Sequence, residues 1–202
     1  MTSWSTSLAT LYYGILADAV DWRSFTSGPV VDLGGGNGHV AIDLATRFPS
    51  LEFIVQDLLP NESAFKATVP PEPVSRVTYQ VQDAFNPQPE DLEPSAYFLK
   101  AVFHDWPDIA CIQILKILVS KMLKFGSTVI MMDQCLQEGK FPLYFEGVIR
   151  HSDIFMFSLF GAKERTLPEW EAMFATAHSR LRLEKAVQPS GSESAVMQFA
   201  IT

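Results

Sequence analysis

Five short apolar segments, separated by helical stretches, constrain the fold of this chain more than any other feature of the sequence. Each is short and apolar enough for a buried strand, and they are Pro29–Leu33, Leu51–Gln56, Arg76–Val81, Ala96–Val102 and Ser127–Met132. Between them, Asn37–Phe48 and Ile109–Leu123 carry apolar residues at helical spacing. Short buried strands joined by helices predict a parallel sheet covered on both faces, which is a doubly wound α/β domain.

The last third of the chain follows a different pattern. Phe145–Phe160 and Leu167–Ala177 are predicted helices, and they are followed by two strand candidates, Leu181–Val187 and Ala195–Ile201. The turn at residues 189–192 predicts that these two strands form an antiparallel hairpin at the edge of the sheet. The expected architecture is therefore a seven-stranded, mostly parallel, Rossmann-like sheet with an antiparallel C-terminal hairpin.

Composition excludes several classes of partner. The 202 residues carry a formal charge of −8, which argues against a nucleic-acid backbone or an anionic membrane as the main partner. Cys111 and Cys135 lack the spacing of a metal site and are expected to be free thiols in a reducing, cytoplasmic compartment. We expect neither a signal peptide nor a transmembrane helix, because no apolar run reaches about 18 residues.

A glycine-rich loop follows the first predicted strand. In Val30–His39, Asp32 is followed by glycines that include Gly34 and Gly36, spaced one residue apart. Glycine lets the backbone turn sharply and lets a ligand approach the main chain. The dinucleotide fingerprint would need glycine where the chain has His39. The loop therefore argues against NAD and is similar to the S-adenosylmethionine loop of class I methyltransferases.

Polar side chains follow the next strands. Asp57 comes about 20 residues after the glycine loop, where an acid can bind a ribose diol, although an Asx turn would explain it as well. The tripeptide of Asp83, Ala84 and Phe85 follows the third strand and could contact an adenine. Lys100 ends the fourth strand and is expected to point into the crevice at the strand ends, unless it is a surface lysine.

His104 is the strongest candidate for chemistry, because it follows the fourth strand and would face the same crevice. An imidazole there can accept a proton from a hydroxyl if a carboxylate supports it. Asp133, expected to end the fifth strand, and Glu164, in a loop, are the candidate carboxylates. A structural alternative is that His104 caps a helix end, with Pro107 starting that helix.

These motifs together resemble the C-terminal catalytic domain of the caffeic acid O-methyltransferase family, particularly its fungal secondary-metabolism members. The resemblance covers nearly the whole chain, and its carriers are Val31–His39, Phe48–Pro49, Val55–Leu58, Asp83–Phe85, Leu99–Asp108 and Lys163–Thr166. It implies the class I methyltransferase fold, S-adenosylmethionine as the cofactor and a small-molecule hydroxyl acceptor.

The resemblance also implies a role for each matching residue. The implied cofactor-binding residues are Asp32, Gly34, Gly36, Asp57, Leu58, Asp83, Ala84, Phe85 and Lys100. By the same resemblance, His104 would be the general base, and Asp133 and Glu164 would support its imidazole ring. Asp153 and Met156 match positions that border the acceptor pocket, and Trp106 would suit a flat aromatic acceptor, although core packing explains Met156 and Trp106 as well.

Family members are homodimers with a helical N-terminal domain, for which this chain has no room before its first strand. We therefore expect residues 1–28 to be a linker helix, with apolar positions Leu11, Tyr12, Ile15, Leu16 and Val20, left from a missing dimerisation domain, and residues 29–202 to be the catalytic domain. The expected reaction is metal-free methyl transfer to a hydroxyl, phenolic by preference, of a small aromatic or polyketide-type metabolite. Two alternatives remain: cofactor-dependent pericyclic or cyclisation chemistry, and a non-catalytic interaction module.

Overall fold

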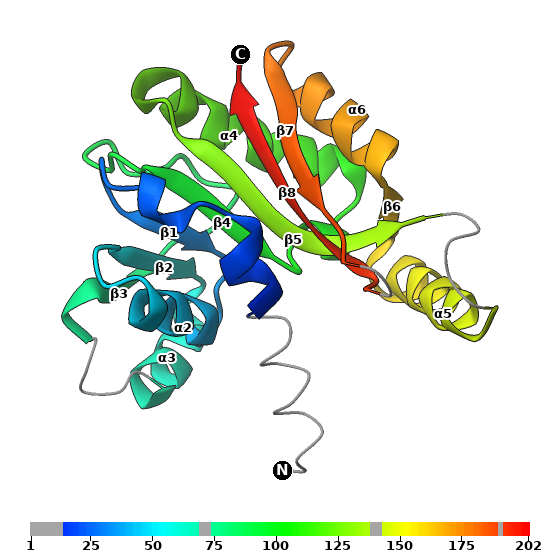
Figure 1. Ribbon diagram of the computed structural model, residues 1–202, viewed down its shortest axis with the longest axis horizontal. Coiled ribbons are helices and arrows are strands. Elements are labelled where there is room, and N and C mark those ends of the chain that lie inside the picture. Colours follow the sequence, from blue (N-terminus) through cyan, green and yellow to red (C-terminus); the bar gives the residue numbers. More distant parts are fainter. Residues whose placement is uncertain (1–13, 69–73, 138–142, 190–191) are drawn as a thin grey trace.

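The computed structural model describes residues 14–68, 74–137, 143–189 and 192–202, and these form a sheet with helices on both faces (Figure 1). The strand order is β3-β2-β1-β4-β5-β8-β7, with the short β6 paired to β5. The strands are β1 (Val30–Leu33), β2 (Phe53–Asp57), β3 (Val77–Val81), β4 (Ala96–Lys100), β5 (Thr128–Leu136), β6 (Arg165–Thr166), β7 (Leu181–Val187) and β8 (Ser194–Ile201). Strands β1 to β5 are parallel, and β8 is antiparallel to both β5 and β7. The predicted α/β architecture and C-terminal hairpin are confirmed.

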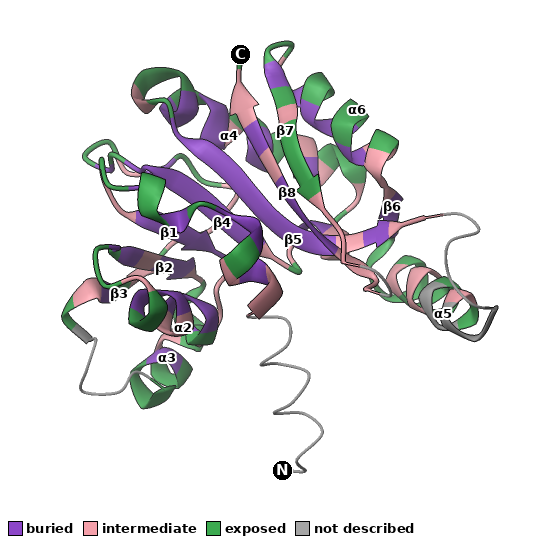
Figure 2. Cartoon of the chain, in the orientation of Figure 1, coloured by how far each residue is buried: buried purple, intermediate pink, exposed green. Residues whose placement is uncertain are grey.

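Two apolar clusters lie on opposite faces of the sheet, because neighbouring strand residues point to opposite sides. Val31 and Leu33 of β1 belong to the cluster under α4 and α6, whereas Val30 belongs to the cluster under α2 and α3. The helices are α2 (His39–Arg47), α3 (Glu62–Thr68), α4 (Asp108–Phe125), α5 (Leu143–Phe160) and α6 (Leu167–Ala177). Figure 2 shows the central strands as the most buried part of the molecule. None of the helices described is both long and apolar enough to cross a bilayer.

Strand β5 is longer than the sequence predicts. It was expected to end at Met132 but continues to Leu136, so Asp133 lies within the strand rather than at its end. The extension exists because β5 gains partners on both sides there: Asp133 pairs with Ala195 of β8, and Cys135 pairs with Arg165 of β6. The sequence analysis predicted neither β6 nor α3.

The first helical residues described, 14–19, pack against the sheet domain. Leu16 is fully buried in the second cluster, and its carbonyl accepts a 3.0 Å hydrogen bond from Trp22 Nε1. Leu11 and Tyr12, predicted for the same helix, lie outside the described residues. The assignment of this segment to a separate linker stays a prediction.

Candidate active site

The glycine loop between β1 and α2 has an open position, at Gly36, and a close approach, at Gly35. Gly36 has a φ of 57°, and a Cβ there would meet nothing within 4 Å, so this backbone faces open space. At Gly35 a Cβ would lie 2.6 Å from Asp32 Cγ, which leaves no room for a side chain. The loop therefore brings bare backbone over the buried Asp32 carboxylate.

Asp57, the last residue of β2, ties this loop to the next one. Its Oδ2 accepts a 2.7 Å hydrogen bond from Gly36 N, and its Oδ1 accepts bonds from Leu58 N (2.7 Å) and Asn61 Nδ2 (3.0 Å). The bond to Leu58 N is local, as in the Asx-type alternative, while the bond to Gly36 spans the sheet edge. Asn61 was missed by the sequence analysis, because no spacing rule points to it.

A cavity of about 230 Å³ lies at the ends of β1, β2 and β3. Its lining residues are Leu33, Gly34, Gln56, Asp57, Leu58, Gln82, Asp83, Ala84, Phe85, Val102 and Trp106. Six of the predicted cofactor residues are among them. Asp83 Oδ1 accepts a 2.9 Å bond from Phe85 N, and the Phe85 ring meets Trp106 edge to face at 4.8 Å between centroids. Trp106, predicted to contact the acceptor, thus forms a wall of this cavity.

Asp32, against Gly35 of the glycine loop, is a buried carboxylate with one unpaired oxygen. The residue is 2% exposed, and its Oδ2 has no hydrogen-bond partner among the described residues. Burial raises the pKa of Asp32 to about 7; Lys100 opposes this increase and Asp57 adds to it. A buried carboxylate oxygen without a donor is costly, and a cationic ligand would relieve that cost.

Lys100, the last residue of β4, lines a second cavity, which has a volume of about 160 Å³. This cavity is lined by Lys100, Ala101, His104, Met132, Asp133, Gln134, Glu193 and Ser194. Ala101 has a φ of 52°, in a region that alanine rarely adopts, and this turn places β4's last residue and His104 on one cavity. Lys100 thus lies close enough to lower the pKa of Asp32 by its charge, and it lines the same cavity as His104.

His104 sits in a short 3-10 turn, Phe103–Asp105, with two buried carboxylates beside its ring. Its Nδ1 lies 3.4 Å from Glu164 Oε1 and 3.7 Å from Asp133 Oδ1, and its backbone N donates to Asp133 Oδ2 at 3.3 Å. Asp105 Oδ1 lies 3.5 Å from Nε2 on the other side of the ring. The structure thus brings together the three residues predicted for catalysis.

The charge state of His104 follows from this setting. Burial lowers the pKa of the imidazole, but the hydrogen bond with Glu164 and the charges of Asp133, Glu164 and Asp105 outweigh burial and raise the pKa to about 9. Burial in turn raises the pKa of Asp133 to about 6, although His104 partly opposes this. Of the structural alternative, Pro107 does stand at the start of α4, as its N-cap residue, but His104 does not cap this helix, which has no side-chain cap.

Helix α5 orders the Glu164 loop. Asp153 Oδ1 accepts a 2.9 Å bond from Glu164 N, and Ser152 Oγ donates to Glu164 Oε1 at 3.0 Å. Asp153, predicted at the acceptor pocket, therefore fixes the loop that carries Glu164. Met156 is half-buried on the same helix. Ser152 was missed because a serine inside an apolar helix gives no catalytic signal in the sequence.

Comparisons with known proteins identify the family of the chain. A model of the O-methyltransferase domain family matches residues 6–179. Over 193 residues the chain is 36% identical to O-methyltransferase pgmB of Aspergillus terreus, covering 93% of this chain and 43% of the relative. It is 37% identical over 185 residues to 6-hydroxytryprostatin B O-methyltransferase of Aspergillus fumigatus, covering 91% and 52%. The chain spans about half the length of these curated relatives.

Solved structures share the fold. The structure of LepI in complex with SAM is 29% identical and superposes with a TM-score of 0.77, covering 90% of this chain and 45% of that one. A structure described as a pericyclic reaction enzyme is 28% identical with a TM-score of 0.77, covering 92% and 46%. The chain therefore belongs to the O-methyltransferase domain family.

Proposed function

We propose that this chain transfers a methyl group from S-adenosylmethionine to a hydroxyl of a small aromatic or polyketide-type metabolite, with His104 as the general base. The observation that carries the proposal is the arrangement at His104 Nδ1, which faces two buried carboxylates beside a cavity at the strand ends. Binding of a cofactor alone would not need that arrangement.

The residues present fit S-adenosylmethionine. Asp57 and Asp83 supply acceptors for ribose hydroxyls and an adenine amine, with Leu58, Ala84 and Phe85 beside them, Gly34 in the cavity wall and Gly36 as open backbone. The unpaired oxygen of Asp32 suits the cationic end of the cofactor, and Lys100 suits its carboxylate. When bound, this cofactor supplies an electrophilic methyl group on a sulfonium. The solved complex of LepI with SAM, on the same fold, supports this assignment.

The protein's part of the chemistry is to orient an oxygen and to remove its proton. Glu164 accepts from Nδ1 of His104 and the charge of Asp133 lies 3.7 Å from the same atom, which leaves Nε2 to take the proton of the acceptor hydroxyl. A base with a pKa of about 9 is well matched to a phenol, whose pKa is near 10, so little free energy is lost in the proton transfer. We assign Trp106, Asp153 and Met156 to the border of the acceptor site.

The name of one relative supports the acceptor class, and the description of one solved structure keeps a second reaction open. The relative that acts on 6-hydroxytryprostatin B carries a hydroxylated substrate in its name, which favours a hydroxyl acceptor here. The similar structure of a pericyclic reaction enzyme shows that the fold also hosts chemistry of another kind. In that second candidate function, the bound cofactor would act as a fixed cation, and His104 would not be needed as a base.

The test combines binding and turnover. Calorimetric titration with S-adenosylmethionine and S-adenosylhomocysteine measures cofactor binding, and a labelled-methyl assay over a panel of phenols and naphthols measures transfer. In His104→Gln we expect kcat to fall by about 10²- to 10⁴-fold with cofactor affinity within twofold of wild type. His178→Gln, a histidine at the end of α6, is the matched control and should keep full activity.

Each other outcome has a clear meaning. Failure to bind either cofactor form contradicts the proposal, and binding without transfer to any acceptor favours the pericyclic or interaction alternatives. Because His104, Asp133 and Glu164 present ligand atoms within 4.8 Å of one another, the assay is repeated with EDTA. We expect unchanged turnover, since the sulfonium needs no Lewis acid; loss of activity with EDTA would show that a metal is required.

A further inference from the structure

The guanidinium of Arg165 is a fully buried cation that the proposed reaction does not use. The residue is 0% exposed, directly follows Glu164 and begins β6. Burying a cation is costly unless its donors are paired, so the location of its partners shows what it stabilises. Arg165 lines neither of the two cavities described above.

Two of its hydrogen bonds hold the backbone on either side of His104. Arg165 Nη1 donates to the carbonyl oxygen of Phe103 at 3.0 Å, and Nη2 donates to the carbonyl oxygen of Trp106 at 2.8 Å. Phe103 immediately precedes the histidine and Trp106 follows it by two residues. One planar group therefore fixes both ends of the turn that carries the imidazole.

The remaining contacts anchor the guanidinium itself. Nε and Nη2 lie 2.8 Å and 2.7 Å from Asp108 Oδ1, at the start of α4, and Cζ lies 4.8 Å from the centre of the Trp170 ring. The backbone of Arg165 is paired with Cys135 of β5, two residues after Asp133. The side chain and backbone of this residue thus connect the segments that carry His104, Glu164 and Asp133.

From these contacts we infer that Arg165 is a positioning residue, which holds the His104 turn against the Glu164 loop and the end of β5. The effect of Arg165 on catalysis rests on the proposed function. The distance between the imidazole and its carboxylates does not depend on any reaction.

The variant Arg165→Lys separates charge from geometry. Lysine keeps a cation beside Asp108 but cannot donate to both carbonyls from one rigid plane. We expect the His104 ring to lose its close contact with Glu164. The pKa of His104 should then fall from about 9 toward the ordinary value, because burial still lowers it while the carboxylates support it less.

Proton NMR titration of the histidine ring measures the pKa of His104 and does not require turnover. The chain has four histidines, and His104→Gln identifies the signal of His104. In Arg165→Lys we expect its titration midpoint to move down by at least one pH unit, and the pH profile of kcat/KM to shift with it. Asp108→Asn, which loosens the anchor but leaves both carbonyl contacts, should produce a smaller shift in the same direction.

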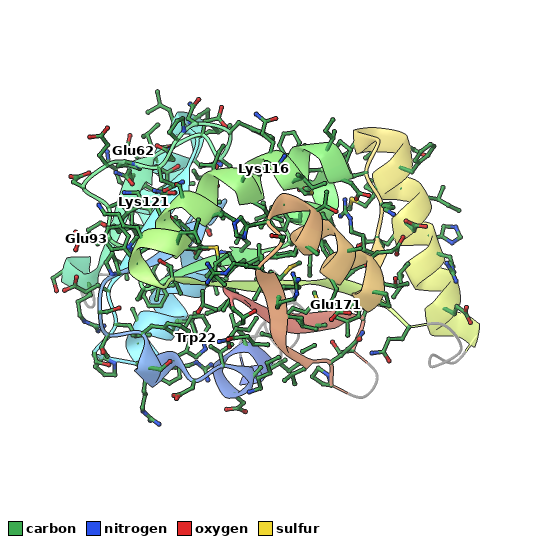
Figure 3. The ribbon with its side chains drawn as sticks, turned by 90° about the horizontal axis from the view of Figure 1, so that it is seen from above. Trp22, Glu62, Glu93, Lys116, Lys121 and Glu171 are labelled. Atoms are coloured by element: carbon green, nitrogen blue, oxygen red, sulfur yellow. The ribbon has the colours of Figure 1, made fainter. Side chains whose placement is uncertain are left out.

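Lys121→Met is the matched control. Lys121 is a buried cation on α4 that also donates to two carbonyls, those of Glu90 and Leu92, both at 2.8 Å. It lies toward the end of α4 that is remote from α5 (Figure 3). We expect this variant to lower the midpoint of urea unfolding while the titration of His104 stays as in wild type.

The decisive result is the comparison between these variants. If Arg165→Lys and Asp108→Asn change only the unfolding midpoint, as Lys121→Met should, Arg165 is a structural residue and the inference is overturned. If Arg165→Lys does not fold, the shift in Asp108→Asn decides. A protein without methyl transfer activity would contradict the proposed function, yet its His104 titration would still test the role of Arg165.

Discussion

The protonation of His104 sets the pH dependence of the proposed reaction. With a pKa of about 9, only about one imidazole in a hundred is unprotonated at pH 7. We therefore expect kcat/KM to rise about tenfold per pH unit and to level off above pH 9. In Glu164→Gln the hydrogen bond that raises the pKa is weakened, so the inflection should move to lower pH. A pH–rate profile measured from pH 6 to 10 with both proteins checks this, and an identical inflection in the two would contradict it.

At the scale of elements, the sequence predicts the strands better than the contacts between them. The apolar segments of β1, β2 and β4 need only local patterning, and their predicted positions are confirmed to within a few residues. The end of β5 is different, because it depends on partners from β6 and β8 that are distant in sequence. The proximity of His104 and Asp133 was predicted because parallel strands end at one edge of the sheet, whereas the place of Glu164 beside them was implied by the family resemblance. Arg165 was not assigned a role, since nothing local shows that an arginine in a loop motif is fully buried.

The glycine loop and the loop after β2 form one element held by a single carboxylate. Asp57 accepts from Gly36 N and Leu58 N, and charge-assisted bonds to backbone are stronger than neutral ones. We expect Asp57→Asn to lower the free energy of unfolding of the cofactor-free protein by about 1–2 kcal/mol, measured by urea titration.

The matched control for this loop is Asp43→Asn, which removes an exposed pair with Arg47 on α2. Surface pairs of this kind contribute about 0.5 kcal/mol or less. Equal stability of the two variants would show that the loop does not depend on Asp57. Cofactor affinity should fall in Asp57→Asn alone.

For the whole molecule, the buried titratable groups predict a stability maximum on the acid side of neutrality. Asp32 and Asp133 have pKa values raised to about 7 and about 6, so their ionised forms destabilise the fold, and that cost disappears as the pH falls from 7 toward 4. His104, with its pKa raised to about 9, stabilises the fold fully below about pH 6.5 and loses this contribution as the pH rises through 9. Both effects lower the free energy of unfolding as the pH rises.

We therefore expect the free energy of unfolding of the cofactor-free protein to decrease continuously from pH 6 to pH 9 in urea titrations. Asp32→Asn should flatten the curve mainly at and below pH 7, and His104→Gln should flatten it between pH 7 and 9. A profile that rises over this interval would contradict the assignment of these groups.

The edge-to-face pair of Phe85 and Trp106 joins the loop after β3 to the turn that follows β4. Trp106 lines the cavity at the ends of β1, β2 and β3 and follows His104, the proposed base, by two residues. Any ligand that moves this ring therefore acts on both halves of the reaction. Thermodynamic reciprocity then requires that the factor by which the first ligand tightens the second equals the factor by which the second tightens the first. The strength of this coupling between the two ligands then depends on one aromatic contact.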